Sequence, residues 1–261
     1  MWAIVIGASG GIGQALVKAL SDDAQITGII ATYHSNPQNI ATDTRIPVHR
    51  HQLDVTDDES IRQFAADLAG KFTQPTVTGP SGSPDAASPI GIRYILNCVG
   101  VLHSDTQAIS PEKSLQAFTA ATLHKSIACN TAPTLLIAKH FAALLKGREH
   151  CVFATISARV GSISDNRLGG WYSYRLSKAA LNMAIKTLAI EWQRTHGNVS
   201  VIALHPGTTD TALSEPFQQN VPEGKLFSAA QTADFLLTVL RSVREQQSGE
   251  FLAFDGSSID W

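Results

Sequence analysis

The first twenty residues constrain the fold most strongly, because they predict a buried strand, a glycine-rich turn and a helix in immediate succession. Residues 2–6 form a short, continuous apolar run, which is typical of a strand buried on both faces. Residues 14–20 place apolar side chains at helical spacing. The sequence between them, Gly-Ala-Ser-Gly-Gly-Ile-Gly, lets the backbone approach a phosphate closely, and the following helix presents free N–H groups.

This turn is therefore predicted to bind phosphate. Three of its glycines, Gly7, Gly11 and Gly13, reproduce the spacing G-x-x-x-G-x-G. An ordinary glycine-rich turn is the alternative, but the strand before it and the helix after it favour the phosphate site. The candidate phosphate-binding residues are Gly7, Ser9, Gly10, Gly11, Ile12 and Gly13.

The rest of the chain continues the alternation of strands and helices. Strands are predicted near residues 26–33, 47–53, 92–96, 151–156, 199–204 and 251–254. Helices are predicted near residues 56–70, 122–146, 172–194 and 232–245, with Pro133 kinking or interrupting the second of them. This order predicts an α/β fold, a Rossmann-type doubly wound parallel sheet of about seven strands with helices on both faces.

No second domain is predicted, so residues 1–261 are interpreted as one nucleotide-binding domain. Residues 73–90 are rich in Pro, Gly, Ser, Thr and Ala and show no periodicity. Because the strand–helix alternation continues after them, they are interpreted as a surface insertion rather than a linker.

Composition excludes several classes of partner. The formal net charge is −2 and no basic block is present, so neither nucleic acid nor an anionic membrane is expected as a partner. No apolar run is long enough to span a bilayer, no signal peptide is evident, and no metal-binding motif is found among the nine histidines. The three cysteines are widely spaced and odd in number, which favours free thiols in a reducing, cytoplasmic compartment.

Polar residues and glycines follow several of the predicted strands. Asp54 follows the third strand, Asn97 and Gly100 the fourth, Ser157 the fifth, and Pro206-Gly207 the sixth. In an open parallel sheet, ligands bind outside the carboxyl ends of the strands. These residues are therefore expected to converge on one site, which is stronger support than any single motif.

Tyr174 and Lys178 stand four residues apart in the predicted helix 172–194 and so share one helical face. The ammonium would favour the phenolate and lower the tyrosine pKa towards working pH, which suits proton exchange with a carbonyl or alcohol oxygen. Taken alone, the pair is more often an ordinary structural pair on a helix surface.

Together these motifs resemble the short-chain dehydrogenase/reductase family over essentially the whole chain. The resemblance rests on the glycine turn, Asp54-Val55, the N-x-x-G from Asn97 to Gly100, the Y-x-x-x-K from Tyr174 to Lys178, and Pro206-Gly207 followed by Thr211. Within the family, residues 161–163, 169–174 and 254–261 look like those of C-factor-like and sniffer-like carbonyl reductases.

The resemblance implies a role for each matching residue. Tyr174 would be the general acid in carbonyl reduction, and Lys178 would lower its pKa and hold the nicotinamide ribose. Asn130 matches the family's helix asparagine, which keeps a water-linked proton path to the lysine. The implied cofactor contacts are Asp54 and Val55 at the adenine, Asn97 and Gly100 at the adjoining ribose region, Thr211 at the carboxamide, and Pro206 and Gly207 beside it. An N-terminal cap role for Asp54 and a plain loop role for Thr211 are the alternatives.

One departure from the family pattern affects the chemistry. After the fifth strand the family usually has Ile-Ser-Ser, whose second serine polarises the substrate carbonyl; here Ala158 stands at that position. Ser157 and Ser162 are the candidate replacements. Loss of one such hydrogen-bond donor would cost about 2–4 kcal/mol of transition-state stabilisation. A second departure, Ile6 in place of the usual threonine, is expected to affect packing only.

Cofactor choice depends on the end of the second strand. A carboxylate there would bind the ribose 2′-hydroxyl of NAD, but none is present. His34, Ser35 and Asn36 could accept a 2′-phosphate instead, and Arg50 could reach it. NADP is therefore favoured, with NAD as the alternative.

The expected function is NADP(H)-dependent reduction of a ketone or aldehyde, or oxidation of the matching alcohol, on a small-molecule substrate. The alternative is a cofactor-binding signalling or regulatory protein with weak or no turnover, which Ala158 keeps open. Residues 214–227 occupy the place of the family's mobile substrate lid. The resemblance also implies a homodimer or homotetramer.

Overall fold

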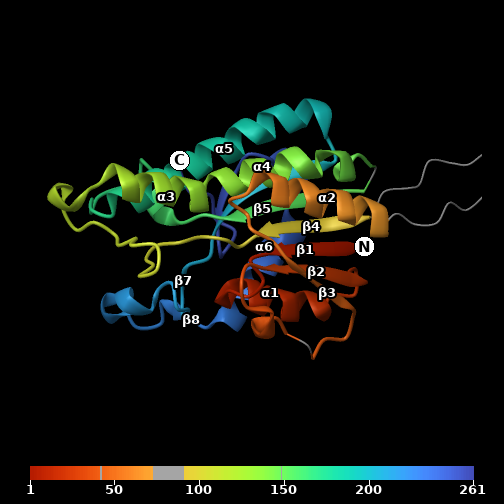
Figure 1. Ribbon diagram of the computed structural model, residues 1–261, viewed down its shortest axis with the longest axis horizontal. Helices are drawn as coiled ribbons and strands as arrows, with labels where there is room; N and C mark the ends of the chain where they lie inside the picture. Colours follow the sequence, from red (N-terminus) through yellow and green to blue (C-terminus); the bar gives the residue numbers. More distant parts are fainter. Residues whose placement is uncertain (42, 73–90, 148) are drawn as a thin grey trace, which may run out of the picture.

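A seven-stranded, entirely parallel sheet forms the centre of the molecule (Figure 1). The computed structural model describes residues 1–41, 43–72, 91–147 and 149–261, so the insertion predicted at residues 73–90 lies outside the described residues. In spatial order the strands are β3-β2-β1-β4-β5-β6-β9. Their bounds are β1 (Trp2–Ile6), β2 (Gly28–Tyr33), β3 (Val48–Gln52), β4 (Ile92–Asn97), β5 (Cys151–Ile156), β6 (Val199–His205) and β9 (Phe251–Ala253). The predicted fold class is confirmed.

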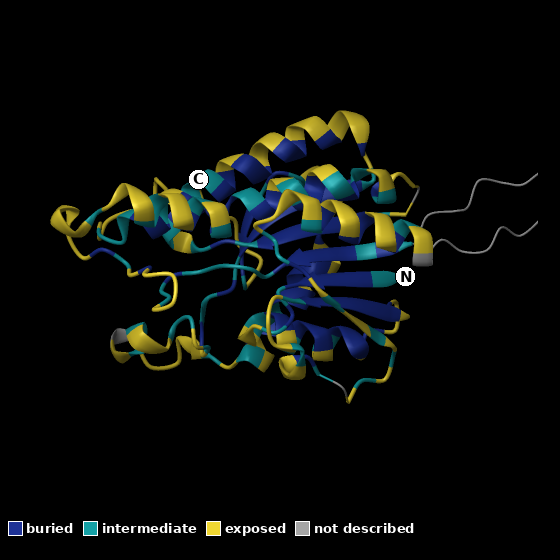
Figure 2. Ribbon diagram, viewed as in Figure 1, coloured by how far each residue is buried: buried dark blue, intermediate teal, exposed yellow. Residues whose placement is uncertain are grey.

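Helices cover both faces of this sheet (Figures 1 and 2). The helices are α1 (Gly11–Ser21), α2 (Asp58–Phe72), α3 (Ala120–Asn130), α4 (Ala132–Phe141), α5 (Tyr172–Thr195) and α6 (Ala229–Ser242). Alternate residues of β1 point to opposite faces: Ile4 and Ile6 pack in one apolar cluster with α2, α4 and α5. Ala3 and Val5 pack in a second cluster with α1 and α6. Both faces of the central strands are therefore buried, as their continuous apolar runs predict.

The strand order changes direction at β1. From β1 the chain adds β2 and β3 on one side, then crosses to add β4, β5, β6 and β9 on the other. A crevice forms where two neighbouring strands connect to helices on opposite faces, and ligands bind there. The glycine turn that follows β1 lies at this point.

The helix predicted at residues 122–146 is two helices with a break at Thr131. Pro133 lies in the first turn of α4, where its missing N–H costs nothing, and it prevents α3 from continuing. A 3-10 turn, Ala142–Leu145, completes the segment. The interruption expected at Pro133 is confirmed, and it places Asn130 at the end of α3.

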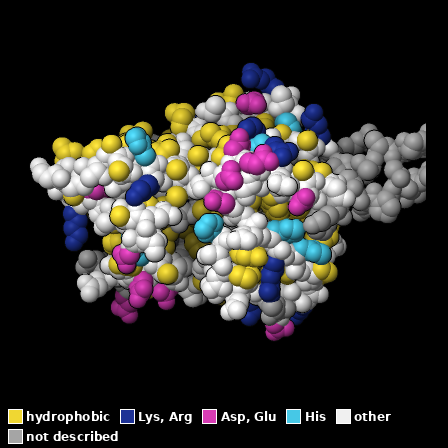
Figure 3. Space-filling model, in the orientation of Figure 1, with side chains coloured by type: hydrophobic (Ala, Val, Ile, Leu, Met, Phe, Trp, Pro, Cys, Tyr) yellow, Lys and Arg dark blue, Asp and Glu magenta, His cyan; other side chains and the backbone are white. Residues whose placement is uncertain are grey.

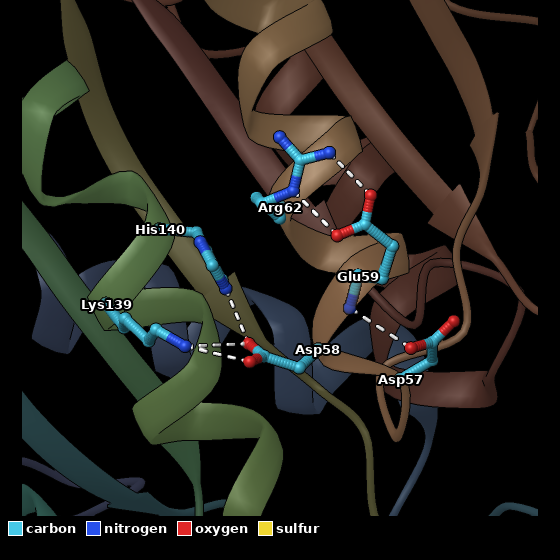
Figure 4. Close-up of polar contacts among 6 residues, drawn as sticks. All are labelled: Asp57, Asp58, Glu59, Arg62, Lys139 and His140. Carbon is cyan, nitrogen blue, oxygen red and sulfur yellow. Dashed lines mark hydrogen bonds and ion pairs between the residues drawn. The ribbon is translucent and has the colours of Figure 1, made fainter.

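Two polar contacts join helices that are far apart in sequence. Asp58, at the start of α2, accepts hydrogen bonds from Lys139 Nζ at 2.8 Å and pairs with His140 Nε2 at 2.5 Å, both on α4 (Figure 4). On the opposite face, the buried Asp23 carboxylate accepts from Arg241 Nε at 3.1 Å and Nη2 at 3.0 Å, which joins the end of α1 to α6.

The segment from residue 208 to residue 227 projects beyond the carboxyl ends of the strands. It contains β7 (Thr208–Thr209), the 3-10 helix Glu215–Asn220 and β8 (Leu226–Phe227), with β7 and β8 paired in parallel. Figure 3 shows a recess on the displayed face, and Lys and Arg side chains are scattered singly across that face. No helix in the described part of the chain is both long and apolar enough to cross a membrane.

Candidate active site

The glycine turn is shaped by close contacts that only glycine allows. Gly7 has φ +77°, and a Cβ there would lie 2.8 Å from Val99 Cγ2. A Cβ on Gly13 would overlap the carbonyl oxygen of Gly7, so α1 packs directly against the end of β1. Gly10 precedes α1 without a side-chain cap, and the first turn contains no acidic residue. The N-terminal N–H groups of α1 are thus left for an external anion.

A cavity of about 420 Å³ extends from this turn along the ends of β2, β3 and β4. It brings together Gly7, Ser9 and Gly10 of the turn with residues predicted to meet the adenosine half of a dinucleotide. These further lining residues are His34, Asp54, Val55 and Gly100. Asn97 is buried beneath them, where its side chain bonds Thr134 Oγ1 and the Val99 N–H rather than lining the cavity.

A second cavity of about 410 Å³ lies beyond the ends of β5 and β6. It is lined by Tyr174 and Lys178, by Ser157 and Ala158, and by the predicted residues Ile12, Pro206, Gly207 and Thr211. Cys98, Val99 and Gly100 line both cavities. The two spaces therefore meet beside the glycine turn, as the two halves of a dinucleotide site require.

Tyr174 and Lys178 lie side by side on the buried face of α5, with Lys178 Nζ 5.8 Å from the centre of the Tyr174 ring. Lys178 Nζ donates to the Ile156 carbonyl at 3.0 Å, whereas the Tyr174 hydroxyl has no partner among the described residues. Burial raises the pKa of Tyr174 and lowers the pKa of Lys178 to about 8.

The expected lowering of the Tyr174 pKa is therefore wrong for this arrangement. Removal of the phenol from water disfavours the phenolate and so raises the pKa. A tyrosine that stays protonated throughout the physiological range is suited to donate a proton rather than to accept one.

Asn130 is placed next to this pair by the break between α3 and α4. Its Oδ1 accepts from the Val101 N–H at 2.7 Å, and its Nδ2 donates to the Val101 carbonyl at 2.9 Å and to Ser177 Oγ at 3.0 Å. A Cβ on Gly100 would lie 3.3 Å from Lys178 Nζ and 3.6 Å from Asn130 Oδ1. Asn130, Gly100 and Lys178 thus meet at one point.

The two candidate serines have different surroundings. Ser157 lines the second cavity beside Ala158, and its hydroxyl donates to Asn182 Oδ1 at 2.6 Å. Ser162 does not line either cavity. Its hydroxyl donates to the Asp260 carbonyl at 2.5 Å and accepts from the Asp165 N–H at 3.1 Å, so it holds the C-terminal segment instead.

Thr211 and Gly207 close the other side of the second cavity. A Cβ on Gly11 would lie 2.5 Å from Thr211 Cγ2, so the loop after β6 packs tightly on the start of α1. Gly207 has φ +75°, and a Cβ there would lie 2.7 Å from the Phe227 ring. Thr211 therefore has a defined place between the glycine turn and the cavity, which disfavours the plain-loop alternative.

At the end of the first cavity beside β2 and β3, Asp54 forms a local turn. Its Oδ1 accepts from the Thr56 N–H at 2.9 Å and from Thr56 Oγ1 at 2.7 Å, and these bonds lower the pKa of the Asp54 carboxyl. The residue before α2 is Asp57, whose side chain accepts from the Glu59 N–H at 3.0 Å (Figure 4). The helix cap proposed as the alternative role of Asp54 therefore belongs to Asp57.

His34 lines the first cavity, whereas Arg50 does not. His34 Nε2 lies 3.9 Å from Asp54 Oδ2, and both residues line the cavity. Arg50 points elsewhere: its Nη2 donates to the Ile40 carbonyl at 3.2 Å, and it lines a separate surface hollow.

Arg159 and Trp171 also line the second cavity and were not predicted from the sequence, and Phe217 lines it from the segment 214–227. The ring centres of Trp171 and Phe217 are 5.0 Å apart, and those of Phe217 and His103 are 5.8 Å apart. Phe217 thus joins the segment 214–227 to Trp171 in the cavity wall and to His103. No local sequence pattern predicts that Phe217 lies beside Trp171. Arg159 could have been predicted as a lining residue, because it directly follows Ala158 just after β5.

Comparison with known proteins identifies the family. A family model described as short chain dehydrogenase matches residues 87–222, which is more than half of the chain. This chain belongs to the short-chain dehydrogenase/reductase family. A second model, described as the NAD dependent epimerase/dehydratase family, matches residues 3–124 of this short-chain dehydrogenase/reductase and so includes the glycine turn.

Individual relatives agree with that assignment, and the chain is an oxidoreductase. It is 29% identical to a 1-hydroxy-2-glutathionyl-2-methyl-3-butene dehydrogenase of Rhodococcus sp. (strain AD45), over 99% of this chain and 98% of the relative. It is 34% identical to C-signal of Myxococcus xanthus, over 41% of this chain and 60% of the relative.

Solved structures share the fold of this short-chain dehydrogenase/reductase. Carbonyl reductase Sniffer of D. melanogaster has a TM-score of 0.79 at 22% identity and covers 100% of this chain and 98% of its own. An NADPH-bound carbonyl reductase from chicken fatty liver has a TM-score of 0.80 at 23% identity, with 100% and 94% covered. The chain thus matches part of C-signal in sequence and shares its fold with Sniffer.

One further residue of this short-chain dehydrogenase/reductase supports the helix that bears Tyr174. Glu112 is 3% exposed, and its carboxylate accepts from the Ser173 N–H at 3.1 Å and from the Ser173 hydroxyl. Its main-chain carbonyl accepts from the Trp171 N–H at 2.5 Å. A carboxylate at a helix N-terminus is favourably placed, so Glu112 fixes the first turn of α5.

Proposed function

We propose that the protein reduces ketone or aldehyde carbonyls with NADPH, with Tyr174 as the proton donor. The observation that supports this most is the shared cavity: Tyr174 and Lys178 face the same space as the start of α1 and Thr211. The Tyr174 hydroxyl is free to bond a ligand, and burial keeps its proton in place. Oxidation of the matching alcohol is the reverse direction of the same reaction.

The residues around the two cavities fit a nicotinamide dinucleotide. The uncapped start of α1 and the glycines at residues 7, 11 and 13 would hold the pyrophosphate. Asp54 and Val55 would contact the adenine, and Gly100 the adjoining ribose, with Asn97 fixing the backbone beneath. Thr211 and the Pro206-Gly207 turn would contact the carboxamide region.

The chain's own contribution to the reaction is binding, orientation and proton transfer. The reduced nicotinamide would supply the hydride to the carbonyl carbon. Tyr174 would donate its proton to the carbonyl oxygen, and the Lys178 ammonium would stabilise the resulting phenolate. Asn130 holds the loop at Val101 and the helix at Ser177, and so keeps a path for proton return next to Lys178.

NADP is favoured over NAD by the end of β2. The sequence after β2 places His34, Ser35 and Asn36 where NAD-binding proteins carry a carboxylate. The Asp54 carboxylate lies 3.9 Å from His34 Nε2, and its Oδ1 is bonded by Thr56. Two proteins of the same fold support the choice: one is described as NADPH bound, and one, from Burkholderia multivorans, as having bound NADP. Ser35 and Asn36 are exposed beside His34 and could bond the phosphate.

The function is tested with purified protein, NADPH and a panel of diketones, quinones and aldehydes. We expect consumption of NADPH by the wild type and a loss of at least about 100-fold in kcat for Tyr174→Phe, with NADPH affinity nearly unchanged. Phenylalanine keeps the ring but cannot donate a proton. Tight NADPH binding without turnover of any panel member would refute the reductase assignment.

A second candidate function is favoured by Ala158. Its methyl group lines the cavity at the position where a hydrogen-bond donor is expected, so a cofactor-binding signalling or regulatory protein with little turnover is the alternative. The same assay separates the two: the alternative requires tight NADPH binding and no reaction with any carbonyl compound.

We further propose that the protein pairs with a second copy through α5. Leu176, Met183 and Ile190 are 48%, 67% and 54% exposed, and a spacing of seven residues places them on one side of the helix. Hydrophobic side chains gather over the α3 and α5 region in the upper left of Figure 3. Burial of such a stripe against its own copy would complete a homodimer or one interface of a homotetramer.

A further inference from the structure

Asn182 follows Tyr174 and Lys178, the proposed proton-transfer pair, along α5. It stands four residues after Lys178 and eight after Tyr174 on α5, so all three share one helical face. Asn182 is 3% exposed, and its side chain reaches Ser157, the first residue after β5. Ser157 in turn lines the cavity that contains Tyr174 and Lys178.

The contact between Asn182 and Ser157 leaves one polar atom without a partner. Ser157 Oγ donates to Asn182 Oδ1 at 2.6 Å, so the serine proton points towards the helix and away from the cavity. Asn182 Nδ2 is buried and makes no hydrogen bond to any described residue. A buried N–H group without an acceptor is rare and costs free energy, more so than an unpaired carbonyl oxygen.

A half-turn of the Asn182 amide exchanges Nδ2 and Oδ1 within nearly the same volume. Nδ2 then donates to Ser157 Oγ, and the serine proton is free to be donated into the cavity. Ser157 is adjacent to Ala158, whose methyl group supplies no donor. Depending on the orientation of the Asn182 amide, the Ser157 hydroxyl therefore donates either to Asn182 or into the cavity.

We propose that Asn182 is a positioning residue whose turned amide makes Ser157 the hydrogen-bond donor to the substrate carbonyl, in place of the hydroxyl missing at Ala158. This inference rests on the proposed carbonyl reduction. It assigns Ser157 a direct contact with substrate, and it assigns Asn182 an effect on turnover without any contact of its own.

Asn182→Asp provides the sharpest test, because an ionised carboxylate accepts hydrogen bonds only. It holds the Ser157 proton permanently away from the cavity, whereas a protonated carboxyl can donate to Ser157 Oγ as Nδ2 does. We expect kcat relative to wild type to fall about 100-fold at high pH and to recover as the pH is lowered and the buried carboxyl becomes protonated.

Other ionisable side chains line the same cavity as Ser157, and they are present in both the wild type and the Asn182→Asp variant. They are Lys178 and Tyr174 on α5, Arg159 after β5, and His205 at the end of β6. Their titration is removed by taking the ratio of variant to wild-type kcat at each pH. NADPH affinity and the thermal unfolding midpoint are measured alongside, because loss of turnover with both unchanged distinguishes positioning from structural damage.

Asn182→Leu is the matched control, since it is similar in size and can neither accept nor donate. It leaves the Ser157 hydroxyl free, so we expect a loss of less than about 10-fold that does not vary with pH. Ser157→Ala should lose about 100-fold, and the double variant Ser157→Ala/Asn182→Leu should lose no more than Ser157→Ala alone.

The outcomes separate the inference from the function on which it rests. A wild type that reduces no carbonyl compound overturns the proposed function and the role of Asn182 with it. An active wild type with equal losses in Asn182→Asp and Asn182→Leu at every pH overturns the role of Asn182 alone. Additive losses in the double variant, or full activity in Ser157→Ala, also overturn it.

Discussion

Lys178 is the residue whose ionisation most directly connects burial to the proposed chemistry. Burial lowers its pKa from 10.5 to about 8, so the ammonium is present below about pH 8 and is lost above it. Burial also raises the pKa of Tyr174, which keeps the phenol protonated across that range. We therefore predict that kcat for carbonyl reduction falls as the pH rises through about 8, because the neutral amine no longer stabilises the phenolate.

The control for this prediction is Lys178→Arg, whose guanidinium stays charged at every accessible pH. Its residual activity should be lower than that of wild type, because the longer side chain fits the buried site poorly, but it should not fall between about pH 7 and about pH 9. The measurement is the pH profile of kcat at saturating NADPH. A flat wild-type profile over that interval would show that the Lys178 charge does not limit the reaction.

The same burial affects stability with a definite sign. The lowered pKa means that the unfolded chain binds a proton more tightly than the folded one, so stability rises with pH between about 8 and 10.5. The change corresponds to about 3 kcal/mol of destabilisation at neutral pH, where the buried amine must be charged. The site is thus maintained at a cost in stability, as is common for catalytic groups.

Among the secondary-structure elements, α1 and α6 pack together in the second apolar cluster and are also joined by an ion pair across 218 residues of sequence. The Asp23 side chain is 6% exposed and that of Arg241 is 52% exposed. We predict that Arg241→Met lowers the free energy of unfolding by about 2 kcal/mol, because it leaves Oδ2 of the buried Asp23 carboxylate without its guanidinium donors, while among the described residues only the Gln25 N–H still bonds Oδ1. Denaturant unfolding measures the change, and NADPH affinity reports whether the start of α1 is disturbed.

An exposed ion pair on α2 provides the matched control for Arg241→Met. Arg62 and Glu59 on α2 are 55% and 61% exposed in their side chains, so Arg62→Met should change stability little. The Asp58 contacts with Lys139 and His140 are also exposed to solvent on the α2 side, and hydrogen bonds from both lower the Asp58 pKa (Figure 4). Equal effects of Arg241→Met and Arg62→Met would refute the assigned importance of burial.

At the scale of the whole molecule, Leu176, Met183 and Ile190 form an exposed apolar stripe on the outer side of α5. We predict that Met183→Asp converts the wild-type dimer or tetramer to a smaller species, because a charge in the middle of the stripe would be buried unpaired in the interface. Size-exclusion chromatography with light scattering measures the mass. Leu226→Asp, at a 38% exposed position in β8, which lies on the other side of the sheet from α5 in Figure 1, should leave the mass unchanged. A monomeric wild type at micromolar concentration would remove the basis of this proposal.

Much of this architecture was predictable because its causes are local. The glycine turn, the apolar strands and the Tyr174–Lys178 spacing depend on backbone geometry and on helical or extended periodicity, which neighbouring residues fix. Predicted element boundaries differ from the structure by a few residues. In α6, Ser228 and Gln231 form a capping box, so the helix begins at Ala229 rather than at 232.

Other features were decided only by tertiary packing. The sequence by itself determined that Tyr174 and Lys178 share a helical face and that glycines follow β1. The tertiary structure decided that burial raises the Tyr174 pKa, where a lowering by Lys178 was expected. It also decided that Ser162 donates to the Asp260 carbonyl and that Ser157 donates to Asn182. Desolvation and hydrogen-bond partners depend on groups brought together from distant segments, and no local pattern encodes which of them will meet.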